Sequence, residues 1–132
     1  MSISNRPSVK WLDLDVTEPV DIKYAVSILG PNSQKLFYSM LEKFESTTIQ
    51  TMTSKLAEGY SIQNWAGIFQ AAHSLKGASG FIGAGKIHYA CYYICEAYGK
   101  NDYKSMLLYY PLIVEAVIEF KRHSHKLTAD YK

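Results

Sequence analysis

Apolar residues in this chain recur mainly at steps of three and four, and this spacing restricts the fold more than any other feature of the sequence. Such steps place side chains on one face of an α-helix, whereas the residues of a half-buried strand alternate at every second position. No segment shows several turns of strict apolar alternation. The sequence therefore predicts an all-α protein.

Proline and glycine divide the chain into segments. Residues 1–20 contain two prolines and little periodicity, so we expect a loosely ordered arm there. A short helix is expected over 21–29, because Gly30-Pro31 is a typical helix stop. Residues 21–132 are expected to form one domain. The residues of the arm that we expect to pack on this domain are Trp11, Leu12 and Leu14.

Four longer helices are expected after this region. The first is capped by Asn32 or Ser33 and the second by Ser61, whose side chains can accept a hydrogen bond from the first turn. Pro111 is either tolerated near the start of the fourth helix or kinks it. Short connections between long helices make neighbours antiparallel. The predicted architecture is an antiparallel up-and-down four-helix bundle with a short N-terminal helix and arm, the four helices covering 32–59, 62–82, 86–98 and 103–126.

Composition argues against several classes of function. The 132 residues carry a net charge of +2 from 14 basic and 12 acidic residues, which is too weak and too diffuse to indicate a nucleic-acid partner. No run of 18 apolar residues and no secretory leader pattern is present. We therefore expect a cytoplasmic protein without a membrane span. If the protein is eukaryotic, it could also enter the nucleus. Its two cysteines, Cys91 and Cys95, are expected to stay reduced.

Residues 71–86, AAHSLKGASGFIGAGK, contain four glycines within nine residues, although each glycine inside a helix costs about 1 kcal/mol relative to alanine. His73 shares one face of this helix with Phe69, Lys76, Gly77 and Gly80. The glycines thus predict an outward-facing histidine that a second macromolecule can approach closely. Alternatively, the two glycines let a neighbouring helix pack closely. The residues expected to face the core are Trp65, Ile68, Ala72, Leu75, Ser79 and Ile82.

A histidine one turn from a lysine is suited to phosphoryl transfer. Neutral imidazole has a lone pair on one nitrogen and is among the side chains that form covalent intermediates. A nearby ammonium disfavours the imidazolium and then attracts a phosphoryl group. His73 and Lys76 are therefore candidates for the nucleophile and its electrostatic assistant, although most such pairs on helices are ordinary solvated surface.

Residues 73–84, HSLKGASGFIGA, closely resemble the signature of histidine-containing phosphotransfer (HPt) domains, which reads roughly H-x-L-K-G-x-S/A-x-x-x-G-A/L. The resemblance extends over about 21–127. It includes Phe44 upstream, a glycine-containing turn at 58–60 and residues 99–102 after the next helix. It implies a free-standing carrier protein that folds as a four-helix bundle.

The resemblance implies roles for the residues of the motif. His73 would accept the phosphoryl group on Nε2, and Lys76 would assist electrostatically. Gly77 would give clearance to an incoming receiver domain, and the docking surface is expected to include Phe69 and Gly80 as well. The residues that would shape the helix and its packing are Leu75, Ser79, Gly83 and Ala84.

Members of the family carry phosphate from the aspartate of one receiver domain, often in a hybrid sensor histidine kinase, to the aspartate of a response-regulator receiver. The resemblance thus implies a carrier without kinase activity, nucleotide or metal of its own, because Mg²⁺ belongs to the receiver. We expect a monomer. The alternative function is a helical adaptor that docks receivers without transferring phosphate, but an adaptor has no chemical need for His73 and Lys76.

The chain departs from the family pattern at one position. Many relatives place a glutamate or glutamine on the next helix, 22 residues after the histidine, and this residue is Cys95 here. The missing orienting hydrogen bond could come from Tyr92 or His88, which lie on the same expected helix. These residues, with Cys95 itself, are the candidates for the side chains around the histidine ring.

Two other features invite a different interpretation. His88, Cys91 and Cys95 could be soft ligands for Zn²⁺, but a fourth ligand would have to come from His123 or His125, and small buried cysteines are the more ordinary interpretation. We therefore predict no metal site. The basic run KRHSHK at 121–126 is expected to be a helix end or a frayed tail.

Overall fold

The structure is a computed structural model that describes residues 34–82 and 84–131, with side chains for 35–82 and 84–126. The expected arm over 1–20, the short helix over 21–29 and Gly83 lie outside these residues. So do Trp11, Leu12, Leu14 and the proposed caps Asn32 and Ser33.

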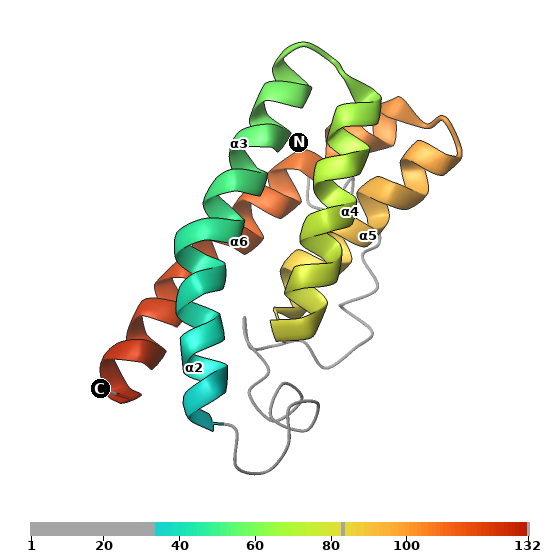
Figure 1. The fold of residues 1–132 in the computed structure, drawn as a ribbon. Helices are drawn as coiled ribbons and strands as arrows, with labels where there is room; N and C mark the ends of the chain where they lie inside the picture. Colours follow the sequence, from blue (N-terminus) through green and yellow to red (C-terminus); the bar gives the residue numbers. More distant parts are fainter. Residues whose placement is uncertain (1–33, 83, 132) are drawn as a thin grey trace.

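Four helical rods make up the described part of the chain (Figure 1). The first consists of α2 (Gln34–Lys43), η3 (Phe44–Ile49) and α3 (Gln50–Ser61), which follow one another without leaving helical backbone angles. It is followed by α4 (Trp65–Ile82), α5 (Gly85–Gly99) and α6 (Tyr103–Tyr131).

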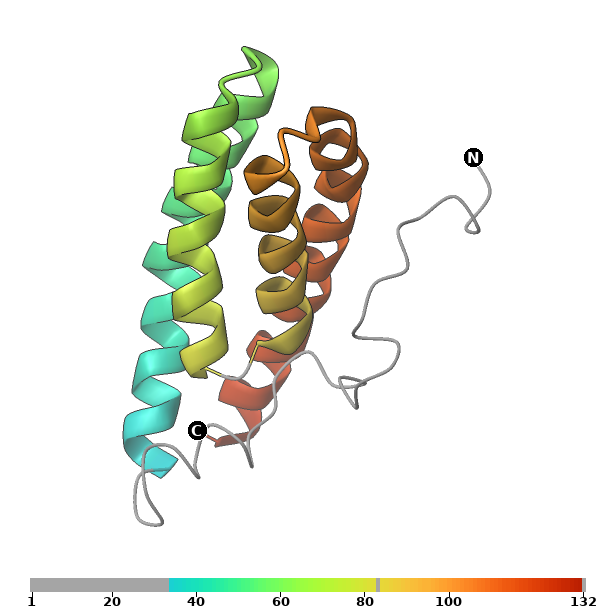
Figure 2. The same ribbon diagram turned by 90° about the vertical axis from the view of Figure 1, so that its right-hand side faces the viewer.

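Successive rods run antiparallel and lie side by side (Figure 2). α4 packs against both α3 and α5, α6 packs against α5, and α2 also contacts α6. The first and last rods therefore close the bundle, and the predicted up-and-down four-helix architecture is confirmed. Among the described helices, none is both long enough and apolar enough to cross a membrane.

The first rod contains a π-helical turn, η3, which the sequence explains. The core residues Phe44 and Ile49 are five positions apart, and five residues of regular α-helix would turn Ile49 about 140° away from Phe44. The wider π-turn, with hydrogen bonds between residues five apart, removes this mismatch. Both side chains are buried, Phe44 at 5% and Ile49 at 0% exposure. The expectation of one regular helix over 32–59 is therefore wrong in this segment.

The boundary between α3 and α4 also differs from the prediction. Ser61 is the last residue of α3 and its hydroxyl donates to the Glu58 carbonyl at 2.8 Å. The cap of α4 is Asn64, whose Oδ1 accepts from the Gly67 amide at 3.0 Å. Gln63, with a φ of 54°, reverses the chain between them. Both Ser and Asn are good caps, so the position of the reversal decided which one is used.

The predicted glycine-containing turn requires Gly59 to lie in the connection before α4. In the structure Gly59 lies inside the last turn of α3 instead. A Cβ on Gly59 would lie 2.8 Å from Cγ1 of Ile68. The glycine therefore allows α3 and α4 to approach each other closely at this point.

The last helix continues through the basic run at 121–126 to Tyr131, so the predicted helix end or frayed tail is wrong. The reason is Glu45 of η3. Its carboxylate accepts from the Ser124 hydroxyl at 2.8 Å and contacts His125 Nε2 at 2.6 Å. These contacts hold the C-terminal part of α6 on the first rod, next to the edge-to-face pair of Phe44 and Phe120.

The π-turn makes a specific prediction about deletions. Removal of the exposed Thr47 places Phe44 and Ile49 four apart, so a regular α-helix can bury both, and the free energy of unfolding should change by less than about 1 kcal/mol. Removal of the exposed Ser54 instead rotates Leu56 by about 100° relative to Ile49, and loss of such a side chain from a core costs about 2 to 5 kcal/mol. Thermal melts followed by circular dichroism measure both. Equal destabilisation by the two deletions would contradict this account of η3.

Candidate functional site

α4 separates a buried face from an exposed one, as its sequence predicts. Trp65 at the start of the helix is half-buried, and His73, near the middle, is exposed. The remaining residues of the predicted seam are all buried: Ile68, Ala72, Leu75, Ser79 and Ile82. The imidazole of His73 is therefore accessible on the surface of the bundle.

The ring of His73 lies in an aromatic stack. It faces Phe69, one turn earlier, with 5.6 Å between ring centroids and 24° between planes. Phe69 in turn stacks on Tyr98 of α5 at 4.7 Å and 21°. Within the described residues, no side chain gives the imidazole a hydrogen bond. Ring contacts that run from α5 through Phe69 thus support the candidate nucleophile.

Both the side chain and the backbone carbonyl of Lys76 contact residues of α5. Its Nζ lies 6.0 Å from the centroid of the Tyr92 ring, and its side chain is half-buried. Its backbone carbonyl accepts from the Ser79 hydroxyl at 3.1 Å and lies 2.8 Å from Nδ1 of His88. The ammonium is therefore kept on the surface that also carries His73, one turn further along α4.

The two glycines of the exposed face differ in their surroundings. A Cβ on Gly77 would have no atom within 4 Å, so this position is open. A Cβ on Gly80 would lie 2.9 Å from Nδ1 of His88. The His88 ring of α5 therefore fills the space that Gly80 leaves, so this position is not open in the way that Gly77 is, and the docking role of Gly80 stays a prediction. Close packing of a neighbouring helix, the alternative interpretation, applies to Gly80 alone.

The residues expected to shape the motif helix lie in the core. Leu75, Ser79 and Ala84 each have an exposure of 0%. The Ala84 amide donates to the Ser79 carbonyl at 2.8 Å, which closes the C-terminal end of α4 just before α5 begins. These contacts fix where α5 starts relative to His73.

The side chains of α5 do not supply the orienting hydrogen bond. The Tyr92 hydroxyl donates to Glu96 at 3.0 Å, and this bond raises the pKa of Tyr92. Nδ1 of His88 forms its hydrogen bond with the Lys76 carbonyl and not with His73. Burial raises the pKa of the half-buried Cys95 thiol, an effect that the nearby Lys76 ammonium partly opposes. Neither Tyr92 nor His88 therefore forms a hydrogen bond with His73 in place of the glutamate or glutamine that many HPt domains have at the position of Cys95.

The alternative of a zinc site finds no support in the described part of the chain, which contains no group of three or more His, Cys, Asp or Glu side chains placed to hold a metal ion. Cys91 is fully buried, and burial raises the pKa of its thiol well above the ordinary value. It therefore behaves as a small core residue.

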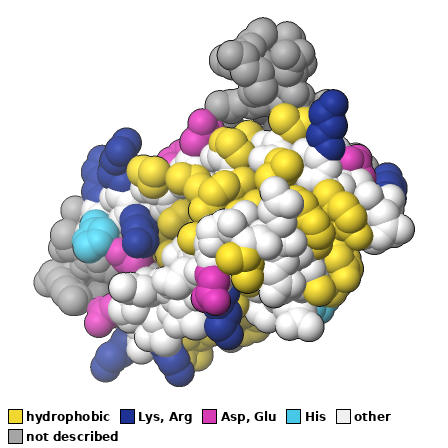
Figure 3. Space-filling model, turned by 90° about the horizontal axis from the view of Figure 1, so that it is seen from above, with side chains coloured by type: hydrophobic (Ala, Val, Ile, Leu, Met, Phe, Trp, Pro, Cys, Tyr) yellow, Lys and Arg dark blue, Asp and Glu magenta, His cyan; other side chains and the backbone are white. Residues whose placement is uncertain are grey.

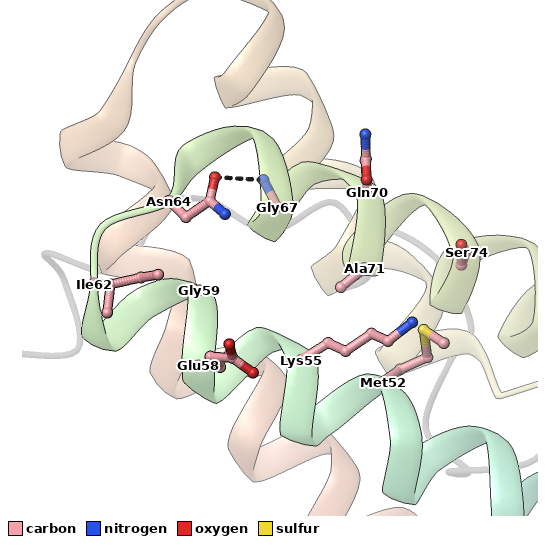
Figure 4. A pocket seen from close by; sticks show the side chains of 10 residues that line it. All are labelled: Met52, Lys55, Glu58, Gly59, Ile62, Asn64, Gly67, Gln70, Ala71 and Ser74. Atoms are coloured by element: carbon pink, nitrogen blue, oxygen red, sulfur yellow. Dashed lines mark hydrogen bonds between the residues drawn. The ribbon is translucent and has the colours of Figure 1, made fainter.

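A groove of about 360 Å³ lies between α3 and α4 on the other flank of the candidate site (Figure 4). Lys55 extends along it from α3, and the bond between Asn64 and Gly67 lies at its end. Ser74, the neighbour of His73, also lines it, so a partner seated over His73 would reach this groove. The lining residues are Met52, Lys55, Glu58, Gly59, Ile62, Asn64, Gly67, Gln70, Ala71 and Ser74.

An aromatic stripe connects the site with one end of the bundle. Trp65, Phe69 and His73 are four residues apart on α4, and Trp65 stacks on Tyr103 of α6 at 4.9 Å and 6°. Figure 3 views the end where α3 joins α4 and α5 joins α6, and hydrophobic side chains are grouped over it. Exposed side chains such as Ile62 and Leu107 belong to this region of the chain. Two half-buried aromatic rings of α4, Trp65 and Phe69, thus lie between this end and His73.

Fold and site together define a helical bundle that carries a nucleophilic side chain on its surface. Comparison with protein-family models matches residues 38–109 to the Hpt domain. This match covers more than half of the chain and includes His73, Lys76 and the glycines around them, so the chain belongs to the Hpt domain family. Comparisons with curated proteins and with solved structures give no significant match.

The different surroundings of the two glycines predict opposite effects on stability. Gly77→Ala should raise the free energy of unfolding by about 0.5 to 1 kcal/mol, because it removes an unfavourable helix residue at an open position. Gly80→Ala should lower it, because the new methyl group displaces His88 from the Lys76 carbonyl and overpacking costs about 1 to 3 kcal/mol. Chemical denaturation of the two variants tests this. A stabilising Gly80→Ala would show that His88 does not need the space.

Proposed function

We propose that this protein is a phosphorelay carrier, in which Nε2 of His73 accepts a phosphoryl group from the aspartyl phosphate of one receiver domain and passes it to the aspartate of another. Hpt domains are phosphocarrier modules of phosphorelays that interact with receiver domains of kinases and response regulators. The observation that carries the proposal for this chain is the exposed His73 ring beside Lys76 and the open position at Gly77.

The proposed transfer needs no base from this chain. The Nε2 lone pair of neutral His73 forms the bond to phosphorus while the bond from phosphorus to the aspartate oxygen breaks, and the receiver's carboxylate keeps that electron pair. The proton on Nδ1 stays in place, so the ring becomes positively charged. Reversal of these steps delivers the phosphoryl group to the second receiver. Such chemistry depends mainly on positioning and on charge stabilisation.

Lys76 supplies the charge in this proposal. Its ammonium lies over the Tyr92 ring on the side of α4 that carries His73. An ammonium there attracts the phosphoryl oxygens, whose negative charge must be accommodated as the group moves between oxygen and nitrogen. We expect the Mg²⁺ of the reaction on the receiver domain, where the aspartate is phosphorylated.

The proposed docking surface is the exposed face of α4 around Gly77. A receiver must bring its aspartate within bonding distance of Nε2, and a side chain at position 77 would stand one turn from that point. We propose that the protein docks as a monomer.

The first test of this function is the identity of the phosphorylated residue. Incubation with a phosphorylated receiver domain should label His73 alone, as a phosphoramidate that is stable to alkali and labile to acid, and His73→Gln should abolish the label. Lys76→Ala should slow transfer by about an order of magnitude, less than the loss of a buried oxyanion donor because Lys76 is half-exposed. Label on the His73→Gln variant would refute the assignment, and receiver binding without any label on the wild type would favour the adaptor.

The docking surface is tested separately by Gly77→Gln. The substitution should leave the fold intact or stabilise it by about 0.5 to 1 kcal/mol, because glutamine is a better helix residue than glycine. It should weaken receiver binding by about tenfold, because the new side chain occupies the approach to His73. Val114→Gln, at an exposed position on α6, is the control and should bind normally. A Gly77→Gln variant that is destabilised but binds its receiver normally would place the docking surface elsewhere.

A further inference from the structure

The structure provides His73 with ring contacts where a hydrogen bond was expected. We propose that Phe69, supported by Tyr98, is a positioning residue that fixes the plane of the His73 imidazole for phosphoryl transfer. This inference rests on the proposed function, but it assigns to Phe69 a role other than docking. It also explains how the site works with a cysteine at position 95.

The geometry favours positioning because the Phe69 ring stacks on two other rings, one from each of two helices. Its plane is inclined by 24° to the ring of His73 on α4 and by 21° to the ring of Tyr98 on α5. Phe69 and Tyr98 are both half-buried, whereas His73 is exposed. The orientation of the imidazole is thus linked to α5, which packs against α4.

Stacking restricts the torsion that matters for the reaction. The imidazole can turn about its Cβ–Cγ bond, a torsion with broad preferences when nothing else holds it. The Nε2 lone pair lies in the ring plane, so this torsion decides whether the lone pair points at an incoming phosphorus atom. A ring stacked on Phe69 keeps its plane close to that of the phenyl ring, which limits the Nε2 lone pair to directions within that plane. Orientation of this kind lowers the cost of reaching the reactive geometry.

The stack should also favour the transition state over the ground state. As Nε2 bonds to phosphorus, positive charge develops on the imidazole. The face of the Phe69 ring attracts a positively charged imidazole more strongly than it attracts a neutral one. A contact that is stronger in the transition state than in the ground state lowers the barrier and so accelerates the reaction. Phe69 therefore should contribute to the rate with which His73 is phosphorylated even when no protein partner is present.

A small phosphoryl donor separates positioning from docking. Phosphoramidate can transfer its phosphoryl group to Nε2, with cleavage of its P–N bond and release of ammonia, and it needs no protein docking surface. The variants are Phe69→Leu, which removes the ring, and Phe69→Tyr, which retains it. Phe81→Leu is the matched control, because Phe81 is an exposed phenylalanine of the same helix whose ring has no described contact with His73.

Three measurements are made on each folded variant: the rate of His73 phosphorylation by phosphoramidate, the affinity for an unphosphorylated receiver, and the NMR shifts of the His73 ring protons. We expect Phe69→Leu to slow phosphorylation by about twofold to tenfold, the range that corresponds to an ordinary aromatic pair. The ring-current shift of the His73 protons should disappear, and receiver affinity should stay within twofold of the wild type. Phe69→Tyr and Phe81→Leu should match the wild type in all three measurements.

Two results would overturn the inference. An unchanged phosphoramidate rate with weakened receiver binding would make Phe69 a docking residue, and an unchanged His73 ring shift in Phe69→Leu would show that the stack does not hold the ring. If Phe69→Leu does not fold, Tyr98→Leu against Tyr98→Phe gives the same comparison from the α5 side. If the wild type accepts no phosphate from either donor, the proposed function fails, while the NMR comparison still decides whether Phe69 orients His73.

Discussion

The hydrogen bond between the His88 ring and the Lys76 carbonyl connects α5 to α4 one turn beyond His73, and the rest of the site depends on this connection. A carbonyl oxygen only accepts, so Nδ1 of His88 is the donor. The ring can reach the carbonyl because Gly80 has no side chain. Once α5 is fixed at this point, its next turns place Tyr92 under the Lys76 ammonium and Tyr98 behind Phe69.

The two glycines show how far helix periodicity can predict a surface. Gly77 and Gly80 lie on one face of α4 by their spacing, and the same spacing correctly places His73 outside the core. It cannot separate the glycine that faces solvent from the one that faces His88, because that difference depends on where α5 crosses the edge of this face. A sequence pattern defines directions around a helix axis, whereas the distance to the neighbouring helix comes from tertiary packing.

The all-α class, the bundle and the buried seam of α4 were predictable because each rests on many residues with the same periodicity. The cap at Asn64 was not, because Ser61 is an equally good cap and only the backbone reversal at Gln63 distinguishes them. The continuation of α6 depends on Glu45, a contact between residues 79 positions apart. The π-turn did have a local signal, the five-residue step from Phe44 to Ile49, which a search for steps of three and four passes over.

A cysteine at position 95 changes the electrostatics of the site in a direction that suits the proposed carrier function. Burial favours the neutral thiol of Cys95, so this residue places no negative charge near Lys76. The one acidic residue of α5 is Glu96, whose carboxylate accepts a hydrogen bond from the Tyr92 hydroxyl and lies 3.8 Å from Lys100. Among the described residues no carboxylate pairs with Lys76, so its ammonium remains available to the phosphoryl group of the proposed transfer. An aromatic contact can therefore orient His73 without introducing an anion that would compete with phosphate for the lysine.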